Sequence, residues 1–200
     1  CTGEVTYRPE PLQRELKVPV GIVLEAYGAS TAESWLPRAA MVNDPMLKPL
    51  LDKFDARENF YKQHPDGSDA DAPPGPESLN ARPAKAGAKP RKMRDPVQDQ
   101  HQPTVMFNGM LAPVVPYAIR GMLWYQGESI VGDTPGLDLY GHVQQVLIRD
   151  WRKRWGEGNF PFYIVQLPGQ ENISNNPRIR EEQMAVLSLP HTAMAVTIDL

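Results

Sequence analysis

Four short stretches along the chain are almost entirely apolar and rich in β-branched and aromatic residues. They span residues 18–26, 118–125, 160–167 and 192–200. Runs of this length and composition predict β-strands. Because polar positions do not alternate with the apolar ones, we expect parallel strands that are buried on both faces.

Between these stretches, apolar residues recur at helical spacing. The clearest case is 137–155, whose stripe comprises Tyr140, Val143, Val146, Leu147, Trp151 and Trp155. Basic residues in its last turns suit the helix dipole, and Gly156 is the predicted stop. Weaker helical patterns cover 10–17 and 178–189. Ser30 and Glu33 have the spacing of a capping box, which predicts a short helix through Trp35.

Strands that alternate with helices are typical of an α/β fold with a mainly parallel sheet and right-handed crossovers. A length of 200 residues fits one domain. One segment interrupts the pattern, since eight of the 21 prolines lie between Tyr61 and Thr104. We therefore expect residues 1–61 and 105–200 to form one folded domain and residues 62–104 to be a flexible, Pro-rich charged insertion.

Charge and composition exclude several classes of protein. With 21 basic and 24 acidic residues, the formal net charge is −3, which argues against a dedicated nucleic-acid binder. The basic half of the insertion could still be a nucleic-acid-binding arm, but no aromatic residues interleave there for stacking. No apolar run approaches the about 20 residues of a membrane span. The single cysteine, Cys1, excludes an internal disulfide framework and a Cys-built zinc site.

Candidate chemistry lies where two predicted strands end, because ligands of parallel sheets bind beyond the carboxyl ends of the strands. The first place is the turn around Gly28, where backbone N–H groups suit an oxyanion. The second is Gln126-Gly127-Glu128-Ser129, where an amide could donate to developing negative charge and a carboxylate could orient a histidine. An ordinary hydrogen-bonded turn fits both places equally well.

Other familiar sites find no support in the sequence. Position 131 is Val131, so Ser129 does not lie in the Gly-x-Ser-x-Gly pattern of a nucleophile elbow. No pair of histidines has the spacing of metal ligands, and no glycine-rich phosphate loop is present. His64 and His101 fall in the predicted insertion, and His142 and His191 fit surface or packing positions. We therefore expect neither a metal nor a cofactor.

At this point the residues resemble a known family. The segment 28–35 is similar to the glycine block of sialate O-acetylesterases, which are serine esterases of the SGNH hydrolase superfamily. Segments 107–113 and 119–129 resemble the most characteristic blocks of the family, above all Trp124-Tyr125-Gln126-Gly127-Glu128-Ser129. Blocks at 147–152, 160–167 and 194–199 follow in the same order. The resemblance implies a three-layer α/β/α hydrolase with a mainly parallel sheet, of the SGNH or flavodoxin-like type.

The family resemblance also implies a chemistry, the hydrolysis of O-acetyl esters on sugars by a serine, a histidine and an orienting acid. Carried over to this sequence, Glu128 is the candidate acid, and Gly28 and Gln126 are the candidate oxyanion-hole donors. Asn108, Gly127 and Trp35 match positions that shape the substrate pocket. The implied partner is an O-acetylated sugar, with no nucleic acid and no membrane, and relatives are commonly exported.

The sequence also departs from the family. It contains no Gly-Gln-Ser-Asn-like block for the nucleophile, and Ile130 stands where an Asn usually follows Glu128-Ser129. We therefore expect the nucleophilic serine and the base histidine to lie outside these 200 residues and the chain alone to be an inactive fragment. Two alternatives stay open: an acetylxylan or other polysaccharide acetylesterase, and a non-catalytic carbohydrate-binding or structural descendant of the fold.

Overall fold

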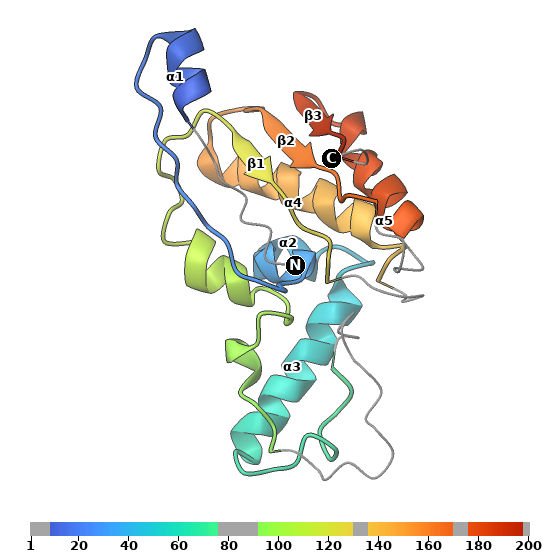
Figure 1. The fold of residues 1–200 in the computed structure, drawn as a ribbon. Coiled ribbons are helices and arrows are strands. Elements are labelled where there is room, and N and C mark those ends of the chain that lie inside the picture. Colours follow the sequence, from blue (N-terminus) through green and yellow to red (C-terminus); the bar gives the residue numbers. More distant parts are fainter. Residues whose placement is uncertain (1–8, 76–91, 130–135, 170–175, 198–200) are drawn as a thin grey trace.

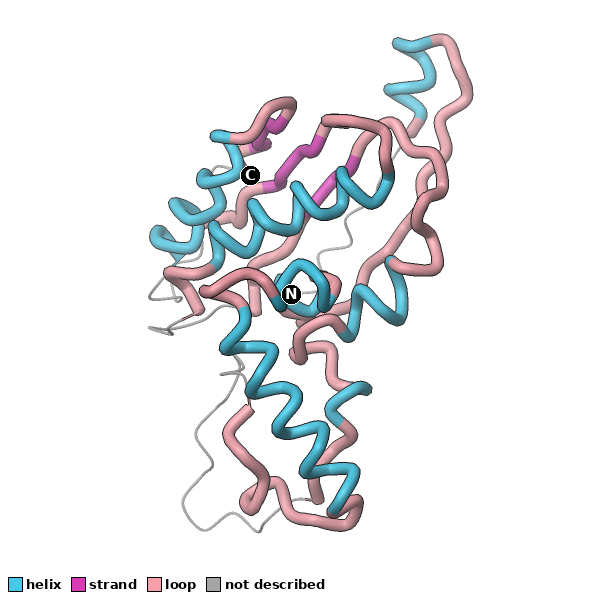
Figure 2. The backbone as a smooth tube through the Cα atoms, turned by 180° about the vertical axis from the view of Figure 1, so that it is seen from behind, coloured by secondary structure: helices cyan, strands magenta, loops and turns pink. Residues whose placement is uncertain are grey.

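The computed structural model describes residues 9–75, 92–129, 136–169 and 176–197. Its centre is a parallel sheet of three strands, β1 (Met122–Trp124), β2 (Phe162–Val165) and β3 (Thr192–Ala195), in the spatial order β1-β2-β3. Helix α4 (Tyr140–Trp155) connects β1 to β2, and α5 (Asn176–Gln183) with the 3₁₀-helix η4 (Met184–Ser188) connects β2 to β3. Figures 1 and 2 show α4 lying across one face of the sheet. The predicted α/β fold with a parallel sheet is confirmed.

Helix α4 follows from its sequence. The predicted stripe faces inward, since Tyr140, Val143, Leu147, Trp151 and Trp155 are all buried. The helix begins three residues later than the pattern suggested. It ends at Gly156, whose φ of 70° lies in the left-handed region that favours glycine.

Aromatic side chains join α4 to the sheet. The ring of Trp151 lies 5.6 Å from that of Trp124 in β1 and 6.0 Å from that of Phe162 in β2. Trp35, on the 3₁₀-helix η1 (Ala32–Trp35), meets Trp124 edge-on at 6.1 Å. The contacts of Trp124 with Trp35 and Trp151 are edge-to-face, and the contact of Trp151 with Phe162 is tilted. Such ring contacts add to the free energy gained by burial, so they hold η1, α4, β1 and β2 in a fixed relation.

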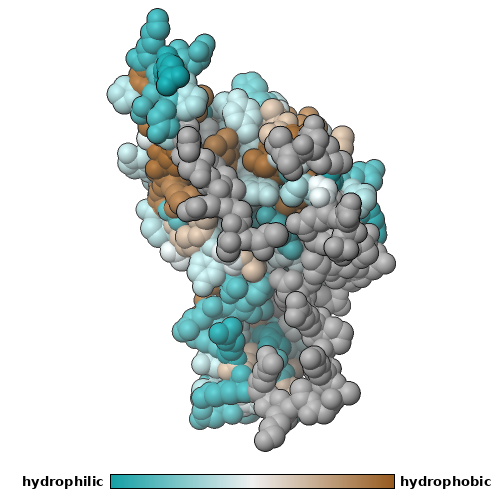
Figure 3. Space-filling model, viewed as in Figure 1, coloured by the Kyte–Doolittle hydropathy of each residue, from teal (hydrophilic) through white to brown (hydrophobic). Residues whose placement is uncertain are grey.

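The other side of the sheet is less well covered than the sequence indicated. Leu123 pairs in register with Tyr163, and Tyr163 with Ala193, so the three side chains share one face. Leu123 is 54% exposed and Tyr163 is 46% exposed. Apolar surface accordingly gathers at the level of the sheet in Figure 3. The expected burial therefore holds for the face that carries Trp124, Phe162 and Ile164, and not for the face that carries Leu123 and Tyr163.

One predicted strand was wrong. Residues 18–26 form no strand in the structure, and Ile22, Val23 and Leu24 are about half exposed or more. A β-branched sequence forms a strand only where a neighbouring strand and a packed face reward it. Pro19 also lacks the N–H that a ladder requires. The other three predicted strands are confirmed but shorter, and residues 198–200 of the last one lie outside the described residues.

The remaining helices flank this core. The predicted helix at 10–17 is confirmed as α1 (Glu10–Leu16), and the 178–189 pattern divides into α5 and η4. A π-helix, η3 (Phe107–Leu111), packs against η1. No helix in the described part of the chain has the length and apolar character needed to cross a membrane.

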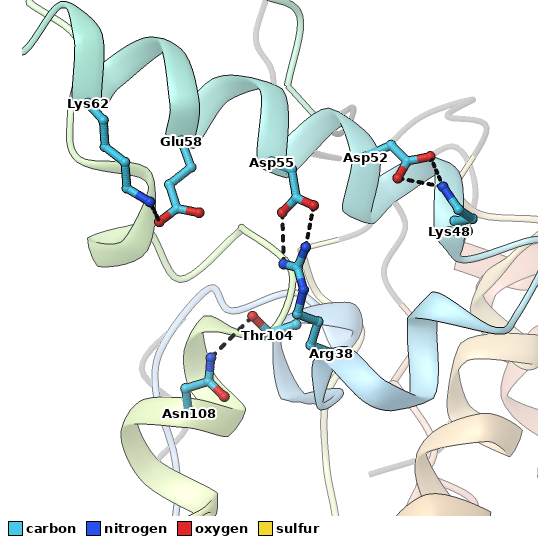
Figure 4. Close-up of polar contacts among 8 residues, drawn as sticks. All are labelled: Arg38, Lys48, Asp52, Asp55, Glu58, Lys62, Thr104 and Asn108. Atoms are coloured by element: carbon cyan, nitrogen blue, oxygen red, sulfur yellow. Dashed lines mark hydrogen bonds and ion pairs between the residues drawn. The ribbon is translucent and has the colours of Figure 1, made fainter.

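Two helices that the pattern did not indicate, α2 (Arg38–Val42) and α3 (Lys48–Gln63), follow η1. Helix α3 forms the arm that extends away from the sheet in Figure 1, and it buries only Leu51 and Phe54. Its surface carries ion pairs, which Figure 4 shows: Arg38–Asp55, Lys48–Asp52 and Glu58–Lys62. Exposed pairs of this kind contribute little to stability, so the arm depends on packing at its base.

The described parts of the 62–104 segment pack against this arm. Helix α3 contacts the 3₁₀-helix η2 (Pro96–Gln98), and Met93 and Pro96 are buried. Residues 76–91 lie outside the described residues. Residues 92–104 are thus not the solvated chain that the proline content predicted, whereas residues 62–75 are exposed or half-buried. The division of the chain into three segments stays a prediction.

Arg152 gives a testable link between α4 and the sheet. We expected it to suit the helix dipole; instead its buried guanidinium donates to the carbonyl oxygen of Phe160 at 3.1 and 2.7 Å and to that of His191 at 3.2 Å. These carbonyls precede β2 and β3. Arg152→Met leaves both without this donor, so we expect the free energy of unfolding to fall by about 2–3 kcal/mol in urea denaturation. The exposed neighbour is the control: Lys153→Met should change it by less than about 0.5 kcal/mol, and an equal effect of both would contradict this assignment.

Candidate functional site

The two turns singled out in the sequence meet at the backbone of Ser30. Its carbonyl oxygen accepts hydrogen bonds from Nε2 of Gln126 at 2.9 Å and from Oγ of Ser129 at 3.1 Å. The three residues are buried, and Gln126 lies 96 positions from Ser30 in the sequence. The structure therefore brings the end of the 18–30 segment and the end of β1 to one place.

The side-chain amide of Gln126 is fully engaged in this arrangement. Nε2 donates to Ser30 and also to Oγ of Ser129 at 3.2 Å, and Oε1 accepts from the hydroxyl of Tyr140 at 2.8 Å. An amide nitrogen has two hydrogens, and both have protein acceptors here. Gln126 thus joins two turns, and donation to an oxyanion would require one of these bonds to break.

Two side chains from the helices hold the turn from behind. Nε2 of Gln183, at the end of α5, donates to the carbonyl oxygen of Gln126 at 3.2 Å, and its Oε1 accepts from the backbone of Leu167 at 3.0 Å. Gln183 therefore ties the ends of β1 and β2 together. The hydroxyl of Tyr140 also lies 2.7 Å from the carbonyl oxygen of Gln126, so its single hydrogen is shared between this oxygen and Oε1. Burial raises the pKa of the phenol, so Tyr140 remains protonated as a donor.

Gly127 is required by its conformation. Its φ is +142°, a backbone angle that residues other than glycine rarely adopt. A Cβ atom at this position would lie 2.9 Å from Cδ1 of Leu167 and 3.2 Å from Oη of Tyr140. The absence of a side chain lets the turn pack closely against Leu167 and Tyr140. The glycine matters for the shape of the turn, and it is buried rather than open to a ligand.

Glu128 and Ser129 differ sharply in exposure. Glu128 is exposed at the tip of the turn, whereas Ser129 is buried and donates its hydroxyl to Ser30. A serine whose proton is committed to a backbone carbonyl is not arranged as a nucleophile, because no base lies in the position of the acceptor. The carboxylate of Glu128 is the group of this turn that an incoming partner can reach.

The other predicted residues lie around this junction. Gly28 is exposed in the turn of residues 27–30, with open space where a Cβ would be. Trp35 is buried in the aromatic core, and its Nε1 donates to Oγ of Ser30 at 2.9 Å, so Ser30 does not form the predicted capping box. Asn108 is exposed on η3 and donates to Oγ1 of Thr104 at 3.3 Å (Figure 4).

Sequence reasoning missed a pair beside this junction, Asp99 and His101. Nδ1 of His101 lies 2.7 Å from Oδ1 of Asp99. Partial burial of Asp99 favours a raised pKa, but hydrogen bonds from His101 and Gln102 outweigh it and lower the pKa of Asp99 to about 2. The hydrogen bond to Asp99 raises the pKa of His101. The Asp-x-His spacing was readable, but the proline content assigned these residues to a flexible insertion.

The other three histidines have different partners. Nε2 of His142 lies 2.8 Å from Oδ2 of Asp44, and Nδ1 of His64 and of His191 contact the backbone carbonyls of Phe60 and Asn159. Among the described residues, no group of three or more His, Cys, Asp or Glu side chains is placed to hold a metal ion.

Comparisons with known proteins find similar sequences. The sequence model of the family described as "Carbohydrate esterase, sialic acid-specific acetylesterase" matches residues 97–200. The sialate O-acetylesterase of Homo sapiens is 32% identical over 123 residues, which cover 53% of this chain and 23% of that protein. The sialate O-acetylesterase of Rattus norvegicus is 25% identical over 217 residues, which cover 92% of this chain and 34% of that protein.

A solved structure gives the same result. The crystal structure of a carbohydrate acetylesterase from Xanthomonas citri matches with a TM-score of 0.61 and 25% identity, over 95% of this chain and 33% of that chain. The chain thus spans about a third or less of the length of these relatives. Because the family model matches just over half of its residues, the chain belongs to the carbohydrate esterase family of sialic acid-specific acetylesterases.

Proposed function

We propose that this chain is the part of a serine-type sugar O-acetylesterase that supplies an orienting acid and an oxyanion donor. The single observation that carries the proposal is the junction at Ser30, where Gln126 and Ser129 bind the same carbonyl. Glu128 and Gly28 are exposed on the two turns that this junction joins at the end of β1. Ligands of α/β proteins bind at such strand ends.

Glu128 takes the role of the triad acid in this proposal. Its carboxylate accepts the Nδ1–H of a histidine, which fixes the tautomer of the imidazole and stabilises the imidazolium that forms during reaction. Its place on a rigid turn supports this role, because Gly127, Tyr140 and Gln183 restrict how the turn can move. The exposure of Glu128 leaves room for a histidine beside it.

The oxyanion donor in the proposal is the backbone of Gly28. The turn is open there, and a backbone N–H needs no side chain to point it. Gln126 is the second donor that the family resemblance implied, but its two amide hydrogens are bonded to Ser30 and Ser129. We therefore assign Gln126 to holding the two turns together.

The nucleophile and the base come from outside these 200 residues in this proposal. The sequence has no Gly-Gln-Ser-Asn-like block, and the Ser129 hydroxyl is committed to Ser30. In the reaction, the serine oxygen attacks the acetyl carbonyl while histidine takes its proton. The sugar hydroxyl then leaves with that proton, and water releases acetate from the acetyl-serine. The family points to an O-acetylated sialic acid as substrate, and acetylated xylan is the second candidate.

The first test uses the 200-residue chain itself. We expect no hydrolysis of an aryl acetate above the buffer rate, because loss of a nucleophile and its base leaves only residual catalysis. The measurement is release of the phenol at several protein concentrations. Hydrolysis that disappears in Ser129→Ala would overturn the assignment and make Ser129 the nucleophile.

The second test uses the longer protein that carries the serine and histidine blocks. Glu128→Gln removes the charge that orients the base, so we expect kcat for an O-acetylated sialic acid to fall by about 10²–10⁴ with little change in KM. Glu181→Gln, which alters an exposed glutamate on α5, is the matched control and should leave kcat unchanged. A near-normal kcat for Glu128→Gln would assign the acid to another residue.

A further inference from the structure

The segment 99–104 lies along η1, one residue beyond the junction at Ser30. The backbone N–H of Thr31 donates to the carbonyl of Gln100 at 3.4 Å, and Oγ1 of Thr31 donates to the carbonyl of His101 at 3.2 Å. The backbone N–H of Thr104 donates to the carbonyl of Glu33 at 3.3 Å. These three hydrogen bonds, of which the two backbone bonds are long, link residues 99–104 to Thr31 and η1.

Both ends of this link lead to residues of the proposed site. Thr31 follows Ser30, whose carbonyl holds Gln126 and Ser129. On the other side, the backbone N–H of Asn108 donates to the carbonyl of Thr104 at 2.9 Å, and its amide side chain bonds Oγ1 of Thr104. The position of Asn108 relative to Ser30 is therefore set by residues 99–104 together with the packing of η3 against η1.

His101 and Asp99 fix the shape of this segment. Oδ1 of Asp99 accepts from Nδ1 of His101 at 2.7 Å and from the backbone N–H of His101 at 3.0 Å, and Oδ2 accepts from Nε2 of Gln102 at 3.1 Å. The hydrogen bond to Asp99 raises the pKa of His101, and so does the charge of Glu33 on η1. Glu33 is buried, with 7% of its surface exposed.

We propose that His101 is a pH-dependent positioning residue, which as an imidazolium bonded to Asp99 holds residues 99–104, and with them Asn108, against the turn of Ser30. The part that concerns Asn108 rests on the proposed function. The link itself does not, because it is a property of the folded chain.

The direction of the pH dependence follows from the two acids. Asp99 and Glu33 both raise the pKa of His101 in the folded state, so the stabilisation is complete below the ordinary value of about 6.5 and is lost as pH rises through the folded pKa. Burial raises the pKa of Glu33, whose part in the link is the backbone carbonyl that accepts the N–H of Thr104. Because the pKa of Asp99 is lowered to about 2, its contribution is present above about pH 4 and is lost as pH falls toward 2.

Hydrogen exchange of the whole 200-residue chain tests the link directly. We expect the protection factors of the Thr31 and Thr104 amides to fall several-fold between about pH 6 and about pH 9. The amide of Gln166, which bonds the carbonyl of Ala195 in the sheet at 2.9 Å, is the internal reference and should keep its protection. Constant protection at Thr31 and Thr104 over this range overturns the proposal.

Variants separate His101 from other titrating groups. His101→Gln should give pH-independent protection at Thr31 and Thr104, at the level of the wild type at high pH. Asp99→Asn should lower the pKa of His101 toward about 6.5 in an NMR titration. His142→Gln is the matched control, since His142 also contacts an aspartate, Asp44, and it should keep the wild-type pH dependence. A pH dependence that survives His101→Gln, or is lost in His142→Gln, overturns the proposal.

The link to catalysis is tested in the longer protein with an O-acetylated sialic acid as substrate. We expect the decline of kcat/KM above about pH 7 to include a limb that is absent in His101→Gln. An unchanged pH profile, together with altered hydrogen exchange, overturns the role of His101 at the site. Absence of any esterase activity overturns the proposed function, whereas the hydrogen-exchange result still decides the link.

Discussion

The carbonyl oxygen of Ser30 accepts two hydrogen bonds from residues almost 100 positions away, and the architecture around the site depends on it. As donors, Gln126 and Ser129 tie the segment before η1 to the end of β1. With them, an exposed turn, a 3₁₀-helix and the end of β1 form one unit. A buried carbonyl with two donors is also costly to disturb, because the loss of either leaves polar groups without partners away from water.

Gln126, which donates to Ser30, is itself held by residues of two helices. The side-chain oxygen of Gln126 accepts from Tyr140, and its backbone oxygen accepts from Gln183. Tyr140 is the first residue of α4 and Gln183 the last of α5. The start of one connecting helix and the end of the other therefore contact the same turn. A chain of hydrogen bonds of this kind is strengthened by its completeness, which makes every member intolerant of change.

The sequence predicted α4 because apolar periodicity records burial, and α4 is buried along its stripe. It predicted the three strands because short runs of β-branched and aromatic residues favour a sheet, even though β1 and β2 are buried on one face only. It failed at residues 18–26, where the composition suits a strand but the structure offers no partner and no covered face. It missed α3, which buries only Leu51 and Phe54 among many charged residues.

At the site, the residue types at the strand ends were predictable, but their partners were not. Tyr140 and Gln183 read as ordinary helix residues, and only the fold brings them to Gln126. Asp99 and His101 had a readable spacing, yet the surrounding prolines obscured it.

The aromatic core has a consequence for spectroscopy. The chain contains four tryptophans, and Trp35, Trp124, Trp151 and Trp155 form one continuous series of ring contacts. Their combined emission therefore comes from one region, the contact of α4 with the sheet and η1, and not from an average over the molecule. Because Trp35 also donates to Ser30, tryptophan fluorescence reports on the environment of the turn that Gln126 and Ser129 bind.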